Sequence, residues 1–461
     1  MVFPQTPLIV AIKLFLGGSW VDVTLDVYAR DRIAVTWGRQ DWASTADTTK
    51  CPLTFNNGTS KASPGVVGRY SRKNPGSDLY GLLGRNTPVR LDLTTPAGVV
   101  ASRFEGHISS WPTRWDLSGK DVYTTVQANG IRRRLTQGTK PLKDALRRHI
   151  AASQPLRYWP LTDGERAREG SEVAVGSQPI RAIGTAGSFY QGQPDWGKGS
   201  LSAWLDPVVQ LPSSTEGNLT VKVTPIVSTS WTADYYRAGA GGQDDDFTVF
   251  DTGQGTDADP VLAWIVDTDR VTNDVELRVL SSGETISSIA NLTTVASPGI
   301  FDTSLHMIRL TTTANGGSTD WTLVIDGATV ASGTYAVLHR PVTRFRFRWG
   351  AFSSMADPMA LGHIAYWGDS PPSAASTWRA AQGYDRELSG RRIERLCTEQ
   401  GVPLTVNGNL DQSVAMGPQK AGAFLDLLQS AADVDGGVLY EARDTVGLAY
   451  RTCRSKYNQG V

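Results

Sequence analysis

Hydrophobic and polar residues alternate with a period of two through most of the first 150 positions. Positions 19–24, 33–37 and 89–93 each carry apolar residues at every second place and are bounded by turn-forming residues, a pattern typical of β-strands with one buried face. Positions 56–80 are rich in Gly, Pro and Ser, too polar for a core and longer than a hairpin needs, which predicts a surface loop. The alternation indicates a barrel or a sandwich in this part of the chain.

The period changes to that of a helix at the end of this segment. Leu142, Leu146 and Ile150 are spaced for one face of a helix, Pro141 precedes them, and cations occupy the last turn. Proline at the start and positive charge at the end both suit a helix. We therefore expect an amphipathic helix over 140–152.

The middle of the chain, from 153 to 372, carries many strand-like runs and almost no helical periodicity. The sequence Asn315-Gly316-Gly317 and the pair Asp326-Gly327 lie between such runs, and these residue types favour the positive φ of hairpin turns. The prediction for this segment is a large antiparallel sandwich of the jelly-roll type.

Helical patterns return after two consecutive prolines. Helices are predicted over 374–384, 389–400 and 420–432, followed by a hairpin over 436–451, from the spacing of apolar residues and a glycine at a helix end. A segment of about 85 residues is marginal for an independent core. We therefore expect it to complete a domain that begins earlier in the chain.

The resulting fold class is mainly β, with a barrel domain that has a few helices and is interrupted by an inserted antiparallel β-sandwich. The predicted parts are 1–152, 153–372 and 373–461. Insertion is tolerated where two chain ends lie close together at a surface. The length of 461 residues also requires more than one core, because single cores stop growing near about 250–300 residues.

Composition adds three expectations. No apolar run approaches the roughly 18–20 residues of a membrane helix, so no membrane span is expected. The apolar stretch 8–16 is interrupted by Lys13 and lacks a small-residue cleavage site, so it does not resemble a signal peptide. Cys51, Cys397 and Cys453 are far apart, which favours reduced thiols over a disulfide framework or a zinc site.

Charge is distributed unevenly although the 45 Lys and Arg balance the 45 Asp and Glu. Residues 1–150 hold 21 cations and 11 anions, residues 151–375 hold 14 and 24, and residues 376–461 hold 10 of each. The basic residues of the first segment are mostly scattered along strands and accompany no nucleic-acid recognition motif. The favoured partner for them is an acidic protein or the acidic middle of this chain, rather than a specific nucleic acid.

The sequence offers no catalytic constellation, so we expect no enzymatic activity and no catalytic residues. The five histidines are far apart, and none has a second His or Cys at ligand spacing. Asp244, Asp245 and Asp246 are weak candidates for calcium ligands, but they lack the alternation and the glycine of a calcium loop, so a solvated acidic loop is favoured and no cofactor is expected. Carboxylates in the strands show no pair that points to glycosidase chemistry.

Sugar binding without hydrolysis needs exposed aromatic rings that stack on pyranose rings. Trp196, Trp231, Tyr235 and Tyr236 lie in loop-like, polar sequence and are the tentative carbohydrate-binding residues. The alternative is that these rings belong to a core, as most tryptophans in strands do.

Several short motifs follow one another in the outer segments of the chain. They are Trp20 to Thr24 with Asp26-Val27, Val35 to Arg39, Cys51 to Asn57, Arg69 to Pro75, Asn86 to Arg90, Arg103 to Ile108, Trp111-Pro112, Trp115-Asp116, and Leu427 to Tyr440. Their order resembles that of minor tail proteins of long-tailed phages that infect actinobacteria, over about 1–150 and 385–461. The middle segment is similar to the concanavalin and laminin-G class of jelly rolls, at 158–161 and 364–367.

The resemblance implies a β-barrel hub in the virion, at the tail tip. Such hub subunits form a homo-oligomeric ring, expected here to be a trimer, that closes the tail tube beside the distal-tail and tape-measure proteins and opens for non-specific DNA passage. The sandwich would then face outward, where it could contact host cell-wall glycan. This chain departs from the family at Trp37, where Arg is more common. It also ends at 461 whereas hub proteins usually continue, so the resemblance implies either a truncated product or a hub whose second half is another polypeptide.

Two other functions remain open. Adhesion to a host carbohydrate could be the main task, with the outer segments as its anchor. A cell-wall polysaccharide hydrolase is the least favoured alternative.

Overall fold

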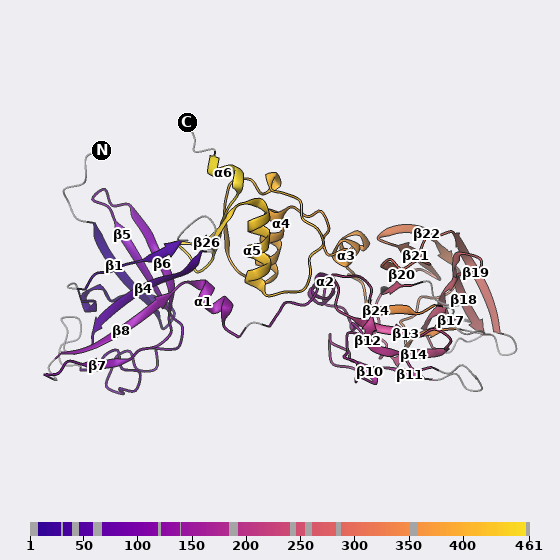
Figure 1. Ribbon diagram of the computed structural model, residues 1–461. Coiled ribbons are helices and arrows are strands. Elements are labelled where there is room, and N and C mark those ends of the chain that lie inside the picture. The colour runs from indigo at the N-terminus through magenta and orange to yellow at the C-terminus, as the bar shows by residue number, and fades with distance from the viewer. Residues whose placement is uncertain are drawn as a thin grey trace. The chain divides into compact units, whose positions relative to one another are not determined.

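The computed structural model shows a chain that is mainly β and forms two compact units. Residues 1–141, 386–416 and 422–461 make the first unit, and residues 142–385 and 417–421 make the second (Figure 1). No helix in the described part is long and apolar enough to cross a membrane. The residues that the structure describes are 8–28, 31–38, 46–58, 67–118, 121–138, 140–183, 192–239, 246–253, 261–282, 287–350 and 357–457.

The N-terminal part of the first unit is a curled antiparallel sheet in the order β2-β1-β5-β6-β8-β4-β3, with β7 paired to β8. A bridge between Val27 and Phe55 brings the chain after β2 against β4, at the other side of the sheet. Alternate residues of these strands face one core, as the period of two predicts. The elements are β1 (Ile9–Leu16), β2 (Ser19–Asp22), η1 (Thr24–Asp26), β3 (Thr36–Gly38), β4 (Asp47–Asn56), β5 (Thr87–Thr94), β6 (Val100–Ile108), β7 (Thr113–Trp115), β8 (Val122–Asn129) and α1 (Ile131–Thr136).

The C-terminal part of the first unit is a small α+β arrangement. Strand β27 lies at the centre of a three-stranded sheet, parallel to β25 and antiparallel to β26. The helix α5 ends at Gly436, whose φ of 69° is the left-handed conformation that glycine adopts at little cost. The elements are α4 (Ser389–Glu399), β25 (Leu404–Asn407), η2 (Leu410–Gln412), α5 (Phe424–Asp435), β26 (Val438–Glu441), β27 (Leu448–Arg451) and α6 (Cys453–Tyr457).

The carboxylate of Glu441 joins these two parts of the first unit. It lies at the end of β26, is 6% exposed, and accepts hydrogen bonds from the backbone N–H of Thr49 at 2.6 Å and of Arg132 at 2.5 Å. Arg132 is in the first turn of α1, so the carboxylate also meets the positive end of that helix. A side chain at Gly130 would occupy the place of this carboxylate, so glycine is required there for the close approach.

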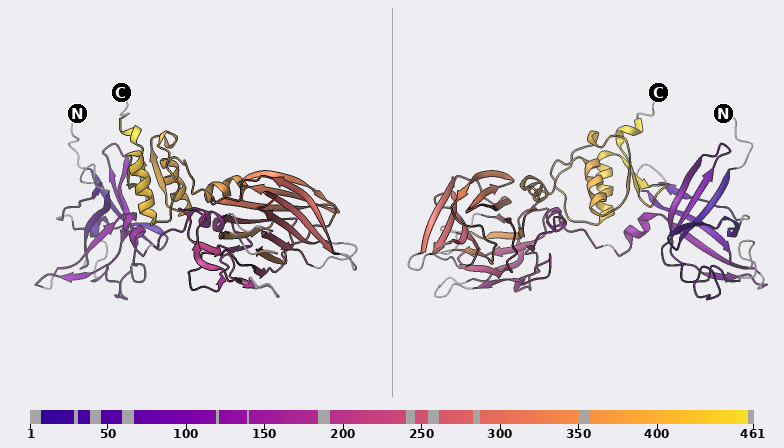
Figure 2. Two further views of the ribbon diagram at one scale, coloured as in Figure 1. Left: turned by 45° about the vertical axis from the view of Figure 1, so that its right-hand side comes forward. Right: turned by 180° about the vertical axis from the view of Figure 1, so that it is seen from behind.

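The second unit is a sandwich in which two antiparallel sheets face each other (Figure 2). One sheet has the order β10-β11-β14-β23-β16-β17-β18-β19, and the other has the order β12-β13-β24-β15-β20-β21-β22, with β9 paired to β24. This architecture confirms the predicted fold class. The strands are β9 (Arg157–Trp159), β10 (Glu169–Gly170), β11 (Ile180–Ile183), β12 (Asp195–Gly199), β13 (Val208–Leu211), β14 (Gly217–Lys222), β15 (Ser230–Ala238), β16 (Asp246–Asp251), β17 (Val261–Asp269), β18 (Asp274–Ser282), β19 (Ser287–Ala296), β20 (His306–Asn315), β21 (Ser318–Ile325), β22 (Ala328–Tyr335), β23 (Arg344–Trp349) and β24 (Met359–Trp367).

Strands β15 and β24 are buried on both faces. One face belongs to the core between the sheets, and the other packs under helices α2 (Ala145–Ala152) and α3 (Ala374–Ala381). Leu146 and Ile150 of α2 lie in this second core beside Trp367. Two-sided burial explains why β24 reads as an almost continuous apolar run rather than an alternating one.

The position of these two helices corrects the predicted boundaries. Contacts divide the chain at 141/142 and 385/386 rather than at 152/153 and 372/373. The reason is that the apolar faces of α2 and α3 are buried on the sandwich. Arg309 of β20 strengthens this attachment, because it pairs with the buried Asp234 at 2.6 Å and donates to the carbonyl of Pro372 at 2.7 Å, just before α3.

His363 of β24 is the most deeply buried histidine of the sandwich. It is 0% exposed, has a φ of 51°, and its Nδ1 lies 2.7 Å from the hydroxyl of Tyr158. Its Nε2 has no hydrogen-bond partner within the described ranges. Burial lowers the pKa of His363 to about 4, because a charged imidazole loses its hydration there. The folded sandwich therefore holds this histidine neutral.

We predict that replacing Glu441 destabilises the first unit. In Glu441→Ala two buried N–H donors lose a charged acceptor, which costs about 2–4 kcal/mol in the free energy of unfolding. Urea unfolding should show a lower midpoint, and Gly130→Ala should show a similar loss. The matched control is Glu394→Ala, whose carboxylate pairs with the exposed Arg391 and should change stability by less than about 0.5 kcal/mol. Equal effects of Glu441→Ala and Glu394→Ala would contradict the prediction.

We also predict that acid weakens the sandwich through His363. Its folded pKa of about 4 lies below the ordinary histidine pKa of 6.5, so between these pH values the unfolded chain binds a proton that the folded chain excludes. The free energy of unfolding should therefore fall as pH falls through this window, by up to about 3 kcal/mol. The variant His363→Asn keeps a residue type that tolerates positive φ and should flatten the dependence.

The control for this pH dependence is His306→Gln. Burial alone would lower the pKa of His306, but the hydrogen bonds that its ring donates to Asp326 and Asp302 raise this pKa overall. His306 therefore stabilises the fold below its unfolded pKa, and removing it should steepen the loss in acid. An unchanged slope in His363→Asn would show that His363 is not the group responsible.

Candidate functional site

The four aromatic residues predicted to bind carbohydrate are buried, so the prediction of exposed rings is wrong. Trp196 is 5% exposed and Tyr235 1%, while Trp231 and Tyr236 are 0% exposed. The first three of these lie in the core between the sheets, and Tyr236 lies in the core under α2 and α3. A buried ring offers no face to a sugar.

Polar residues in β15 caused this error for Trp231, Tyr235 and Tyr236. Asp234 pairs with Arg309, and Thr232 shares a 2.9 Å hydrogen bond with Thr311 of β20. The polar side chains of this strand are therefore satisfied inside the protein and do not mark a solvent-exposed loop.

The acidic candidates do not form a described site. Asp244 and Asp245 lie outside the described residues, and Asp246 begins β16 with its backbone paired to Thr268. Within the residues that the structure describes, no group of three His, Cys, Asp or Glu side chains is placed to hold a metal ion.

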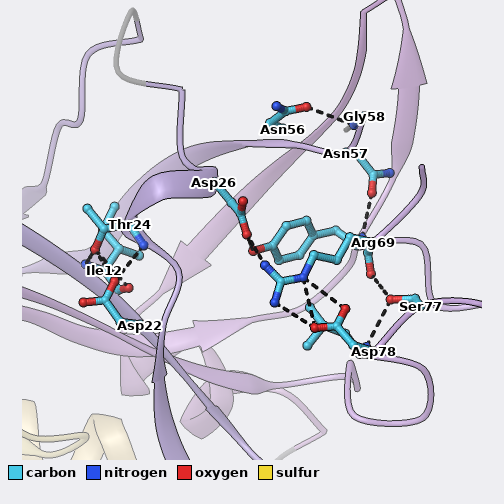
Figure 3. Close-up of polar contacts among 12 residues, drawn as sticks. Ile12, Asp22, Thr24, Asp26, Asn56, Asn57, Gly58, Arg69, Ser77 and Asp78 are labelled. Carbon is cyan, nitrogen blue, oxygen red and sulfur yellow. Dashed lines mark hydrogen bonds and ion pairs between the residues drawn. The ribbon is translucent and has the colours of Figure 1, made fainter. Parts of the chain in front are cut away.

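A polar cluster in the first unit brings together residues that are far apart in the sequence (Figure 3). Arg69 lies between two carboxylates, paired with Asp26 and, through two of its nitrogens, with Asp78 at 2.8–3.2 Å. The hydroxyl of Tyr70 donates to the same Asp26 at 2.7 Å. Asp26 belongs to η1 and is 1% exposed. This cluster fastens the segment 67–85 to the start of the barrel sheet.

The electrostatics of the cluster favour its charged arrangement. The hydrogen bond from Arg69 lowers the pKa of Asp78, and the same bond is the largest cause that raises the pKa of Arg69. Burial, followed by the hydrogen bond to Asp26, raises the pKa of Tyr70 far above its usual value, so this phenol remains a donor. Arg69, Tyr70 and Asp78 fall in the loop predicted over 56–80, and Asp26 was noted only as part of a motif. The cluster itself was not predicted, because residues 26, 69 and 78 give no local signal that they meet.

Asn57 ties this segment to a second one. It is fully buried, accepts from the backbone N–H of Tyr70 at 2.6 Å, and its amide lies 3.1 Å from Ser71 Oγ and 3.4 Å from Thr113 Oγ1. The hydroxyls of Ser71 and Thr113 lie 2.8 Å apart. The ring of Trp111 stacks on Tyr70 at a centroid distance of 5.8 Å. The segments 67–85 and 109–113 are thus held together at several points.

A groove of about 640 Å³ lies between these two segments. Three exposed cations, Arg72, Lys73 and Arg85, line it. Its other lining residues are Ser71, Ser109, Ser110, Trp111, Pro112 and Thr113. Its lining contains no carboxylate, so the groove combines positive charge with hydroxyl groups, which is a set of donors suited to an anion.

The sandwich has a smaller cavity of about 260 Å³ at one end of β13, β15 and β24. Its polar side chains are Lys198, Ser200, Gln210 and Thr303, and the remaining wall is formed by small or apolar residues. Amide, hydroxyl and ammonium groups of this kind can bind the hydroxyls of a small polar ligand.

Comparison with known proteins gives a limited result. No family model matches the chain, and no curated protein matches it. Solved structures with some likeness include the binding domain of botulinum neurotoxin DC in complex with rat synaptotagmin II, at a TM-score of 0.35 and 10% identity. Others are the ligand-binding domain of serotype D in complex with N-acetylneuraminic acid (0.33 and 7%) and the receptor-binding domain of type G (0.30 and 8%). The match covers 50–53% of this chain and 52–54% of those chains, so it spans about half the length of each.

Proposed function

We propose that this protein is a non-catalytic structural component of a phage tail tip, with the first unit as a hub subunit and the sandwich as an outward domain. The observation that carries the proposal is that the motifs resembling minor tail proteins, in 1–150 and 385–461, all fall within or at the border of one compact unit. Glu441 links the two separated segments through buried hydrogen bonds. A pair of segments inherited as one domain would be expected to fold in this way.

Exposed apolar side chains on the first unit support a role in assembly. Trp115, the last residue of β7, is 64% exposed, and Leu117 just after it is 110% exposed. Val99 and Val100, where β6 begins, are 61% and 60% exposed. Contiguous exposed apolar surface is a feature of protein interfaces. In the proposal these surfaces contact neighbouring subunits of a homo-oligomeric ring, a trimer in the simplest case, or the distal-tail and tape-measure proteins.

The test of the tail-tip proposal is to locate the protein in purified particles of the parent phage. Antibody raised against residues 155–372 should label one end of the tail, at the tip, when particles are imaged by electron microscopy. Pre-absorbing the antibody with purified protein should remove the label. Particles without label, in preparations where a known tail protein is detected, would overturn the virion assignment.

Adhesion to host glycan is the second candidate function, and the polar cavity beside Lys198 favours it. The full chain should bind polysaccharide prepared from the host cell wall, and Gln210→Ala with Lys198→Ala should weaken this binding at least fivefold, as expected for the loss of hydrogen bonds worth about 1 kcal/mol or more. Lys222→Ala, at an exposed position on β14, is the control. Absence of binding across wall fractions would leave the sandwich without an adhesive role. Release of reducing sugar in the same incubation would instead favour the hydrolase alternative.

A further inference from the structure

We infer that the groove between segments 67–85 and 109–113 is a binding site for the phosphodiester backbone of a linear polymer without stacked bases, such as a poly(alditol phosphate). The inference goes beyond the proposed tail-tip role and does not depend on it. It rests on three features of the groove: unpaired positive charge, fixed hydroxyl donors, and the burial of its aromatic ring.

The positive charge of the groove is not neutralised by the protein. In segment 67–85 the only carboxylate is that of Asp78, and Asp78 pairs with Arg69 together with Asp26. Neither Lys73 nor Arg85 has a hydrogen-bond or ion-pair partner among the described residues. Asp26 and Asp78 therefore both pair with Arg69. The cations that line the groove remain available to a ligand.

One of these cations is held in place for binding. The Nε–H of Arg72 donates to the carbonyl of Leu83 at 2.9 Å. Its two terminal nitrogens make no hydrogen bond within the described ranges. An arginine fixed through Nε loses less conformational entropy when its terminal nitrogens bind an anion, and its planar geometry suits two oxygens of one phosphate.

The hydroxyls of the groove are fixed by the same framework. Asn57 holds Ser71 and Thr113 at the junction of the two segments, and the indole of Trp111 donates to the carbonyl of Gly84 at 3.3 Å. Ser109 and Ser110 extend the hydroxyl set along the same segment. Arg, Lys, Ser and Thr are among the residue types that contact phosphate oxygens in protein–DNA complexes.

The aromatic residue argues for a polymer without bases. Proteins that bind single-stranded nucleic acid usually offer exposed rings on which bases stack. In this groove the only aromatic lining residue is Trp111, which is 7% exposed and packs against Phe55 and Tyr70. A chain of phosphates joined by short polyols would contact the cations and hydroxyls and would need no stacking platform.

The experiment measures binding of the full chain to fluorescently labelled poly(glycerol phosphate) by anisotropy, over a range of salt concentrations. Binding should weaken as salt rises, with a slope of log K against log salt near −2 if about three phosphates are neutralised. Arg72→Gln and Arg85→Gln should each weaken binding at least fivefold and make the salt slope shallower by about 0.7. Arg391→Gln, an equal charge change at an exposed position that has its own acidic partners, should have little effect.

Competing ligands decide the chemical class. Unlabelled poly(glycerol phosphate) should displace the probe, whereas poly-glutamate at the same charge concentration should displace it weakly. Equal displacement by poly-glutamate would overturn the phosphate assignment, and tighter binding of oligothymidylate, weakened by the same two variants, would assign the groove to nucleic acid instead. No binding by the wild type, or binding unaffected by Arg72→Gln and Arg85→Gln, would overturn the site itself. Near-ultraviolet circular dichroism of each variant checks that the fold is retained.

Discussion

The first unit depends on the two hydrogen bonds that the buried carboxylate of Glu441 accepts. This carboxylate comes from a strand near the end of the chain and satisfies two backbone donors, at Thr49 and Arg132, that are more than 300 positions away. A buried donor without an acceptor is costly, so neither part of the unit is complete without the other. The contact also fixes the identity of Gly130, since only a residue without Cβ leaves room for the carboxylate. This one side chain thereby makes a single unit out of segments that the sandwich separates in sequence.

In the sandwich, the sheet that contains β15 and β24 is covered on both faces. One face of β15 and β24 meets the opposite sheet, and the other is covered by α2 and α3. The polar groups trapped by this arrangement are matched to partners, as in the Asp234 and Arg309 pair, because an isolated buried charge would be strongly destabilising. His363 has one ring nitrogen without a hydrogen-bond partner in the described structure, and it remains neutral because burial lowers its pKa.

The sequence was informative where one face of an element is buried. Alternation with a period of two predicted the strands of both units, and apolar spacing predicted α2, α3, α4 and α5 to within a few residues. It was misleading in β15, where buried polar residues resembled a loop and made Trp231, Tyr235 and Tyr236 look exposed. It was silent about the cluster of Asp26, Arg69 and Asp78, because the contact between Arg69 and Asp26 spans 43 positions and leaves no local pattern. The predicted domain boundaries differ from the observed ones at α2 and α3. Helical periodicity shows that one face of a helix is buried, but it does not show which domain covers that face.

The basic excess of the first 150 residues also takes on a different meaning in three dimensions. Along the sequence the cations are scattered, which argued against a defined binding surface. In the folded unit two groups of these cations have distinct surroundings. Lys13, Arg69 and Arg90 pair with Asp92, with Asp26 and Asp78, and with Glu105, whereas Arg72, Lys73 and Arg85 converge on one groove without a carboxylate in its lining. Holding like charges together is unfavourable by itself, and the groove tolerates it because its cations are exposed to water and Arg72 is fixed by the carbonyl of Leu83. The groove gathers three cations at a place where hydroxyl donors are already fixed, which is the arrangement that an anionic ligand requires.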